Sequence, residues 1–319
     1  MAQPPSLEET VAAPALFLAG PTAVGKSELA LVLAQRLNGE LISADSMQVY
    51  RGMDIGTAKP GAVERARVPH HLLDVAEPDQ PFDAAQFVTL ACTAVADIRS
   101  RGRLPILCGG TGLYFKAYLE GLGQAPARDP ALRAQLEATP LAQLLDELER
   151  TDPATFERID RQNPRRVFRA IEVIRLTGKP FSQQRSTWSP APAAASSPHN
   201  AFGLARLPAD LQRRIEARVD AMFRAGLVAE TAALLQRGLA NNRIALQALG
   251  YRQVEEHLRG LRSLEETIQL VKIRTRQFAK KQMTWFRRQL NLRWVHLTAD
   301  ESAEAAAEKL IAVFLDRQK

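Results

Sequence analysis

The sequence predicts an α/β fold: a P-loop, doubly wound parallel sheet that carries a helical insertion subdomain and ends in a helical C-terminal region. Three observations predict it. A glycine-rich loop near residue 20 stands between a short apolar run and a helical pattern. Strand-like and helix-like segments then alternate up to about residue 121, and such alternation is typical of a parallel sheet. Beyond residue 121 the pattern changes to short helices separated by prolines.

The predicted strands and helices of the N-terminal part follow from apolar spacing. The apolar run Ala15–Gly20 is the first strand, and a helical pattern follows over residues 26–37. Glu40–Ala44 is a second strand. Apolar residues at helical spacing over 83–101 precede a third strand, Leu104–Cys108, which ends in glycines. Because the carboxyl ends of parallel strands meet at one edge of a sheet, the loops after these strands are expected to line one crevice.

The pattern also predicts the division of the chain. We expect an N-terminal extension over residues 1–14, an α/β core made of 15–121 and 202–319, and a helical insertion over 122–201. Within the insertion, an Asn-Pro start and a Gly-x-Pro stop predict a helix over 164–177. The core then resumes with a strand at 202–207.

Two further helices are expected in the C-terminal region. Residues 210–224 place Leu211, Ile215 and Val219 on one face. Ser263 and Glu266 stand at the spacing of a capping box, which begins a long helix to about residue 288.

The charge of the chain, +7 overall, is concentrated in two segments. Residues 271–293 hold eight basic and no acidic residues, and residues 158–185 hold eight basic and two acidic ones. Such patches attract a polyanion, nucleic acid above all, although a solvated helix face is the simpler explanation for either segment alone. No apolar run is long enough to span a membrane, and the first 14 residues do not resemble a secretory signal, so we expect a cytoplasmic protein without a membrane partner.

The glycine-rich loop fits the pattern G-x-x-x-x-G-K-[ST]. Its glycines allow backbone N–H groups to surround a phosphate, the lysine adds a positive charge, and the final hydroxyl is a candidate ligand for Mg²⁺. The pattern does not distinguish a nucleoside triphosphate from a diphosphate. The predicted phosphate-binding residues are Gly20, Pro21, Thr22, Ala23, Val24, Gly25, Lys26 and Ser27, with Ser27 as the metal ligand.

Two polar residues at strand ends are candidates for chemistry. Asp45 follows the second predicted strand, where it is able to accept a proton from a nucleophile. The alternative for Asp45 is a helix cap or an indirect magnesium partner. Thr111 follows the third strand and is able to hydrogen-bond a substrate, or else is an ordinary turn residue. His70 and His71 are adjacent, so their side chains diverge, and packing or polar contacts are favoured over a metal site.

Eight segments in this order resemble the tRNA dimethylallyltransferase family (tRNA isopentenyltransferases), bacterial in type. They are GPTAVGKS, LISADSMQVYRGMDIGTAKP, PHHLLD, CGGTGLYFKAYLEGL, QNPRRVFRAIEV, RIEARVDAM, ALGYRQ and TRQFAKKQMTWFR, and they extend from about residue 15 to the end. The resemblance implies transfer of dimethylallyl from dimethylallyl diphosphate, with Mg²⁺, to N6 of the adenosine 3′ of the anticodon. The acceptors are tRNAs that read codons beginning with U.

The resemblance also implies roles for individual residues. The loop of residues 20–27 binds the donor diphosphate, Asp45 is the base, Arg218 lies near the diphosphate, and Thr111 belongs to the catalytic group. The helical insertion contributes to binding the anticodon stem-loop. The residues that match tRNA-contacting positions are Asp45, Ser46, Met47, Gln48, Thr111, Arg133, Gln162, Asn163, Pro164, Arg165, Arg166, Gln247, Ala248, Leu249, Gly250, Tyr251 and Arg252.

Three other functions are compatible with parts of the pattern. A P-loop kinase of a small metabolite requires ATP turnover but has no use for the two basic segments. A nucleotide-switched RNA-binding protein requires an RNA affinity that depends on nucleotide. Transfer to free AMP is disfavoured by the insertion and by QNPRR. We expect a monomer.

Overall fold

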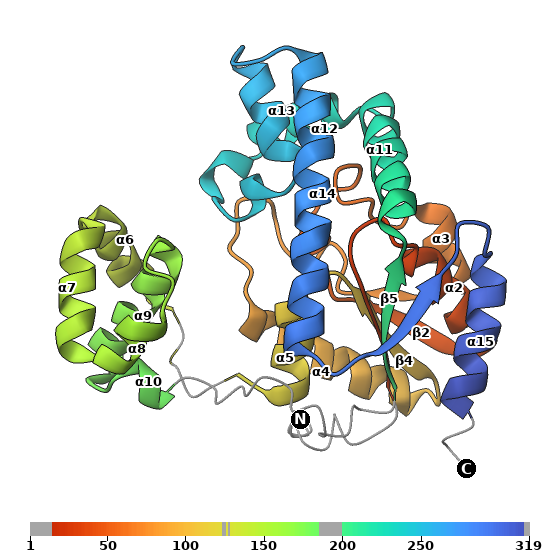
Figure 1. The fold of residues 1–319 in the computed structure, drawn as a ribbon, viewed down its shortest axis with the longest axis horizontal. Coiled ribbons are helices and arrows are strands. Elements are labelled where there is room, and N and C mark those ends of the chain that lie inside the picture. The colour runs from red at the N-terminus through yellow and green to blue at the C-terminus, as the bar shows by residue number, and fades with distance from the viewer. Residues whose placement is uncertain (1–14, 123–125, 127, 185–199, 316–319) are drawn as a thin grey trace. The chain divides into compact units, whose positions relative to one another are not determined.

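The computed structural model describes residues 15–122, 126, 128–184 and 200–315. These residues divide into two compact units with boundaries near residues 119 and 190. The larger unit contains one sheet of six parallel strands in the order β3-β2-β4-β1-β5-β6 (Figure 1). The strands are β1 (Leu16–Ala19), β2 (Gly39–Ser43), β3 (His70–His71), β4 (Leu104–Gly109), β5 (Ala201–Arg206) and β6 (Arg293–Leu297). The predicted parallel α/β fold is confirmed.

Helices cover both faces of the sheet (Figure 1). Alternate residues of β1 point to opposite faces, as in any strand. Leu16 and Leu18 belong to a core cluster with α2 and α15, whereas the ring of Phe17 lies 5.8 Å from that of Tyr118 in α5. The helices around the sheet are α2 (Lys26–Arg36), α3 (Ala62–Arg67), α4 (Ala84–Ser100), α5 (Gly112–Glu120) and α15 (Ala303–Leu315).

A helical layer completes the larger unit. The Ser263 hydroxyl accepts the Glu266 N–H (3.2 Å), and the Glu266 carboxylate accepts the Ser263 N–H (2.8 Å), so the predicted capping box begins α14. α14 packs along α11 through Ile215, Val219 and Val271. This layer contains α11 (Pro208–Arg224), α12 (Leu227–Gln236), α13 (Tyr251–Leu258), α14 (Leu264–Gln289) and the short 3-10 turns η1 (Leu239–Asn241) and η2 (Ala245–Gln247).

The smaller unit is helical and has a core of its own. Five short helices pack around Leu136, Leu144, Leu148, Val167 and Ile171, all of which are fully buried. They are α6 (Pro130–Ala138), α7 (Leu141–Thr151), α8 (Pro153–Arg158), α9 (Pro164–Thr177) and α10 (Phe181–Gln184). The helix predicted over 164–177 is therefore present at those bounds.

The two ends of α9 show which residues start and stop this helix. Gly178 adopts the left-handed conformation (φ 67°) that stops a helix, as its position in the sequence predicts. Asn163 precedes the helix but its side chain makes no capping hydrogen bond. Pro164 at the first helical position is thus the signal that starts α9.

A buried carboxylate fixes the strand that leads to Asp45. The Glu40 side chain, in β2, is 2% exposed and contacts His71 Nε2 (2.7 Å) and two guanidinium groups, those of Arg101 (2.8 Å) and Arg103 (3.1 Å). Burial alone would raise the pKa of Glu40, but the hydrogen bonds from His71 and Arg101 outweigh it and hold the pKa below its usual value. The carboxylate is therefore ionised at neutral pH.

Glu40→Gln is expected to destabilise the protein by about 3 kcal/mol at pH 7, because it removes the buried anion that pairs with the partly exposed guanidinium groups of Arg101 and Arg103. Because the pKa of Glu40 is lowered on folding, its contribution is complete above the ordinary value near 4.5 and is lost as the pH falls through the folded pKa. Urea unfolding of the wild-type protein and of Glu40→Gln at pH 7 and pH 4 measures the difference in their free energy of unfolding. Glu308→Gln, at an exposed ion pair with Arg36, is the control. An equal difference at both pH values would contradict the prediction.

Within the described residues, no helix is both long and apolar enough to cross a membrane.

Candidate active site

The loop between β1 and α2 has the backbone conformation of a phosphate-binding loop. Ala23 (φ 63°) and Gly25 (φ 105°) both lie in the left-handed region, and Lys26 begins α2 directly after them. Left-handed residues in such a turn direct successive N–H groups into one concavity, and the helix N-terminus adds its dipole. The loop predicted from the sequence, Gly20 to Ser27, therefore has a backbone conformation that is able to hold an anion.

Three long side chains from distant elements hold this loop. The Gln282 side chain of α14 accepts the Thr22 N–H (2.9 Å). Arg214 of α11 donates to the Ala23 carbonyl (2.9 Å), and Arg206 of β5 donates to the Val24 carbonyl (2.8 Å). The sequence prediction included none of these three residues, because each is more than 180 positions from the loop and no local pattern links them.

The surroundings of Lys26 disfavour its protonated, positively charged form. Its ammonium donates to the Pro21 carbonyl at 2.6 Å. The pKa of Lys26 is lowered to about 8, chiefly by burial and to a smaller extent by the guanidinium of Arg218, while Cys108 and Asp45 act in the opposite direction. An anion bound at the loop would favour the charged form of this lysine.

The turn after β2 holds Asp45 in place. One Asp45 carboxylate oxygen accepts the Met47 N–H (2.9 Å) and, at 3.4 Å, the Gln48 N–H. Thr111 supports the same turn: its hydroxyl accepts the Ser46 N–H (3.0 Å) and donates to the Ser46 hydroxyl (3.3 Å), and its own N–H donates to the Ala44 carbonyl (3.1 Å). These contacts connect Thr111 to the residues on either side of Asp45.

Arg218 of α11 completes the charged group. Its guanidinium donates to the Thr57 carbonyl at 3.3 Å, and it interacts electrostatically with both Asp45 and Lys26. Burial lowers the pKa of Arg218 and the Asp45 carboxylate opposes that shift. One anion and two cations therefore lie together beside the phosphate loop.

The segment that carries Thr57 is itself fixed by a partly buried acid, Glu230. The Glu230 carboxylate of α12 accepts the N–H groups of residues 54–56 at 2.8 to 3.3 Å. Tyr251 donates its hydroxyl to Glu230 (2.6 Å) and accepts the Gly56 N–H (3.1 Å). A Cβ on Gly56 would lie 2.4 Å from the Tyr251 ring, so glycine is required there.

The structure places the predicted tRNA-contacting residues in two groups, one in each unit. In the larger unit, Asp45 to Gln48 are partly exposed, while Tyr251 is fully buried and its hydroxyl holds Glu230. In the 247–252 segment, the exposed side chains are those of Gln247 and Arg252. Ala248 and Gly250 are buried, and Leu249 is partly buried.

In the smaller unit the predicted tRNA-contacting residues differ in their exposure and in their contacts. Gln162, Pro164, Arg165 and Arg166 are exposed at the start of α9, and Asn163 is partly exposed. Arg133 is instead occupied within the unit: it contacts Glu137 (3.3 Å) and Glu172 (4.0 Å) and lies over the Phe168 ring.

A pocket adjoins the phosphate loop. It has a volume of about 570 Å³ and combines polar residues, among them Ser27, Gln48 and Cys108, with the apolar side chains of Leu31 and Ile42. Its lining connects the end of the loop with the turn after β2.

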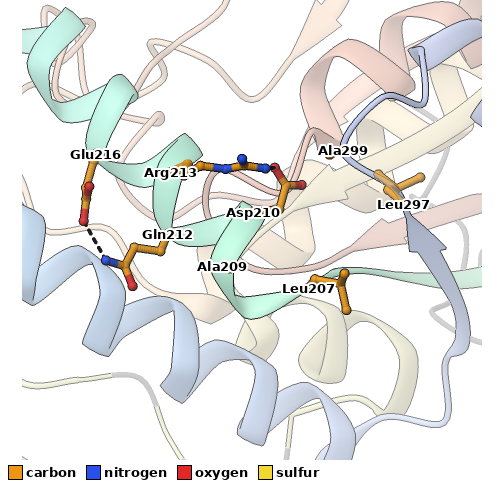
Figure 2. A pocket seen from close by; sticks show the side chains of 8 residues that line it. All are labelled: Leu207, Ala209, Asp210, Gln212, Arg213, Glu216, Leu297 and Ala299. Carbon is orange, nitrogen blue, oxygen red and sulfur yellow. Dashed lines mark hydrogen bonds and ion pairs between the residues drawn. The ribbon is translucent and has the colours of Figure 1, made fainter.

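A second pocket, of about 430 Å³, lies where α11 begins (Figure 2). Its charged and polar groups satisfy one another: Arg213 approaches Asp210 (3.4 Å), and the Gln212 amide donates to Glu216 (2.9 Å). It contains none of the predicted site residues. The pocket beside the phosphate loop is lined by two predicted site residues, Ser27 and Gln48, so we take it as the candidate active site. Its lining does not include Lys26, Asp45, Thr111 or Arg218.

The adjacent histidines make polar contacts, as the sequence favoured. His70 Nδ1 lies 2.7 Å from the Val68 carbonyl and His71 Nε2 2.7 Å from Glu40. Among the residues that the structure describes, no cluster of three or more His, Cys, Asp or Glu side chains is placed to hold a metal ion. The oxygens beside the phosphate loop, Ser27 in particular, are the ones that fit a hard cation which also binds phosphate.

Comparison with known proteins gives consistent results. The model of the IPP transferase family matches residues 48–289. A tRNA dimethylallyltransferase 1 of Trichlorobacter lovleyi is 48% identical over 284 residues, which cover 88% of this chain and 92% of that protein. A tRNA dimethylallyltransferase of Halorhodospira halophila is 46% identical over 315 residues, which cover 94% and 97%.

Solved structures agree. The crystal structure of the full-length tRNA isopentenylpyrophosphate transferase of Bacillus halodurans aligns with a TM-score of 0.67 at 38% identity, over 96% of this chain and 99% of that one. A eukaryotic dimethylallyltransferase acting on tRNA aligns with a TM-score of 0.74 at 28% identity, over 95% and 78%.

Proposed function

Because this chain belongs to the IPP transferase family, we propose that it transfers a dimethylallyl group from dimethylallyl diphosphate to tRNA. The acceptor atom is N6 of the adenosine 3′ of the anticodon in tRNAs that read codons beginning with U, and diphosphate is released. The observation that carries this proposal is the grouping of Asp45, Lys26 and Arg218 beside one phosphate loop. With tRNA as the acceptor, we expect the reaction in the cytoplasm and a monomeric enzyme.

The cations of the site serve the leaving group. When the bond between the allylic carbon and the diphosphate oxygen breaks, its electron pair goes to the diphosphate, where negative charge gathers. The loop N–H groups, Lys26 and Arg218 stabilise that charge as it forms. The pocket of Leu31 and Ile42 beside Ser27 suits a ligand with an apolar tail and an anionic head.

Magnesium is the cation expected with a diphosphate. The Ser27 hydroxyl, at the start of α2 and in the lining of the pocket, would hold Mg²⁺ together with donor oxygens and water. When bound, the ion neutralises part of the charge on the leaving diphosphate.

Asp45 serves the nucleophile. The exocyclic amine of adenine is weakly nucleophilic because its lone pair is delocalised into the ring. As N6 bonds to the allylic carbon, it must lose a proton, and the Asp45 carboxylate accepts it. Thr111 and the N–H groups of Met47 and Gln48 keep that carboxylate in place.

Basic side chains of both units are available for the tRNA. The base to be modified must leave its stack in the anticodon loop, as in other recognition of single-stranded RNA. On α14, the exposed residues Lys280, Lys281 and Arg288 surround Trp285 in a groove of about 490 Å³. On α9, Arg165 and Arg166 are exposed within the QNPRR segment. We assign both surfaces to phosphate contacts.

Replacing Arg165 and Arg166 together with alanine is expected to weaken tRNA binding about tenfold and to make the salt dependence of binding shallower, because two phosphate contacts are lost. Filter binding from 50 to 300 mM salt measures both effects. Arg175→Ala is the control, because Arg175 is also on α9 but its guanidinium is paired with Glu147 of α7. An unchanged slope of log affinity against log salt would contradict the assignment.

The activity itself is tested with radiolabelled dimethylallyl diphosphate, Mg²⁺ and unmodified tRNA, alongside reactions with free AMP and with ATP alone. Label in tRNA that digests to a prenylated adenosine supports the proposal. Label on AMP alone overturns the acceptor. ATP turnover without transfer overturns the chemistry and favours a kinase.

A further inference from the structure

A buried amide lies between the two halves of the candidate active site. Gln282 is 8% exposed and projects from the inner side of α14. Its oxygen accepts the Thr22 N–H (2.9 Å), and its nitrogen donates to the Gly110 carbonyl (2.8 Å). Both polar ends of the side chain are therefore satisfied by backbone groups of other elements.

The two backbone groups belong to opposite sides of the proposed chemistry. Thr22 is part of the phosphate loop. Gly110 directly precedes Thr111, whose hydroxyl holds the Ser46 N–H in the turn of Asp45. A Cβ on Gly110 would lie 2.6 Å from the Gln282 nitrogen, so this glycine allows the amide to approach. Gln282 therefore links the phosphate loop, through Gly110 and Thr111, to the turn that carries Asp45.

We propose that Gln282 is a positioning residue for the transfer reaction, and that its amide fixes the phosphate loop relative to the turn that carries Asp45. The inference rests on the proposed function. Without the amide, the loop and the turn keep their own hydrogen bonds but lose their shared support. The donor diphosphate and the base then no longer meet in one geometry, and misplacement of reacting groups is costly to rate.

Only a side chain with one donor and one acceptor suits this place. The Thr22 N–H can only donate and the Gly110 carbonyl can only accept, which also fixes the orientation of the amide. Leucine would leave both backbone groups unpaired in a buried place. A glutamate carboxylate would still accept from Thr22 but would face the Gly110 carbonyl without a proton to donate.

The glutamate variant distinguishes a positioning role of Gln282 from a purely structural one. A protonated glutamate offers a carbonyl to Thr22 and a hydroxyl to Gly110, so it reproduces the pairing of the amide. Burial favours that neutral form. The effect of Gln282→Glu should therefore depend on pH in a way that the wild type does not.

The experiment compares Gln282→Leu, Gln282→Glu and the wild-type protein for donor KM, kcat, tRNA affinity, inhibition by inorganic diphosphate and thermal stability. Gln269→Leu is the control, because Gln269 lies exposed on the same helix and bonds only Glu265. We expect Gln282→Leu to lower kcat/KM for the donor by about 100-fold and to weaken inhibition by diphosphate, with tRNA affinity unchanged. The ratio of Gln282→Glu to wild-type kcat/KM should rise about tenfold from pH 8 to pH 6.

Two results would overturn the inference. One is a donor KM and kcat in both variants equal to those of the wild type. The other is a loss of thermal stability with a parallel loss of tRNA affinity and no rescue of Gln282→Glu at low pH, which would make the amide a purely structural support. Absence of transfer in the wild-type protein would instead refute the proposed function.

Discussion

Asp45→Asn is expected to lower turnover about a thousand-fold, within the range that general base catalysis supplies. The amide oxygen of asparagine can still accept the N–H of Met47, which bonds Asp45 at 2.9 Å, so the turn should keep its shape. What disappears is the ability to take the proton from N6 of adenine. Single-turnover transfer with saturating donor measures the rate, and filter binding measures tRNA affinity, which should change by no more than about twofold.

Asp97→Asn is a matched control, because Asp97 is an exposed aspartate of α4 that pairs with Arg101. It should transfer at the wild-type rate. If Asp45→Asn lost tRNA affinity to the same degree as it lost turnover, Asp45 would be a binding residue and the proton would need another acceptor.

Lys26→Met is expected to lower kcat/KM for the donor by about a thousand-fold, because a preorganised charge that meets the leaving group contributes several kcal/mol to the transition state. Methionine keeps an unbranched chain in this partly buried place but carries no charge. Inhibition by inorganic diphosphate should weaken in parallel, whereas tRNA affinity should stay the same. Lys309→Met, which removes an exposed ammonium paired with Glu301, is the control.

The same lysine predicts a dependence on pH. Because burial lowers the pKa of Lys26 to about 8, the ammonium is charged below that pH and neutral above it. Only the charged form attracts diphosphate, so the donor KM of the wild-type protein should rise as the pH increases through 8. In Lys26→Met this rise should be absent. A rise of equal size in the variant would assign the titration to another group.

The sequence predicted the centre of the fold because its signals there are local. The strand before Gly20, the helix after Lys26 and the capping box at Ser263 each depend on residues within a few positions of one another, and each is present in the structure. The phosphate loop, Asp45, Thr111 and Arg218 were all proposed from motifs, and the structure brings them together.

What the sequence did not predict depends on contacts across the chain. The edge strand β6 (Arg293–Leu297) lies beyond the predicted long helix and was not predicted, because its residues form no continuous apolar run. The links from Gln282, Arg206 and Glu230 to the loops join positions more than 170 residues apart. The contacts of Thr111 with Ser46 in the neighbouring turn, and the burial of Tyr251, a predicted tRNA-contacting residue, were not predicted. Neither outcome can be read from a local pattern.

The position of β1 in the sheet has a consequence for synthesis on the ribosome. β1 lies between β4 and β5, so Phe17 pairs with Ala201 on one side and with Leu107 on the other. A nascent chain can complete one edge of β1 early, but the other edge stays open until the whole insertion has left the exit tunnel. Open strand edges and late long-range pairing favour misassembly. The insertion, which has its own core, can fold during that interval, and slow translation just before residue 201 would expose the half-built sheet for longest.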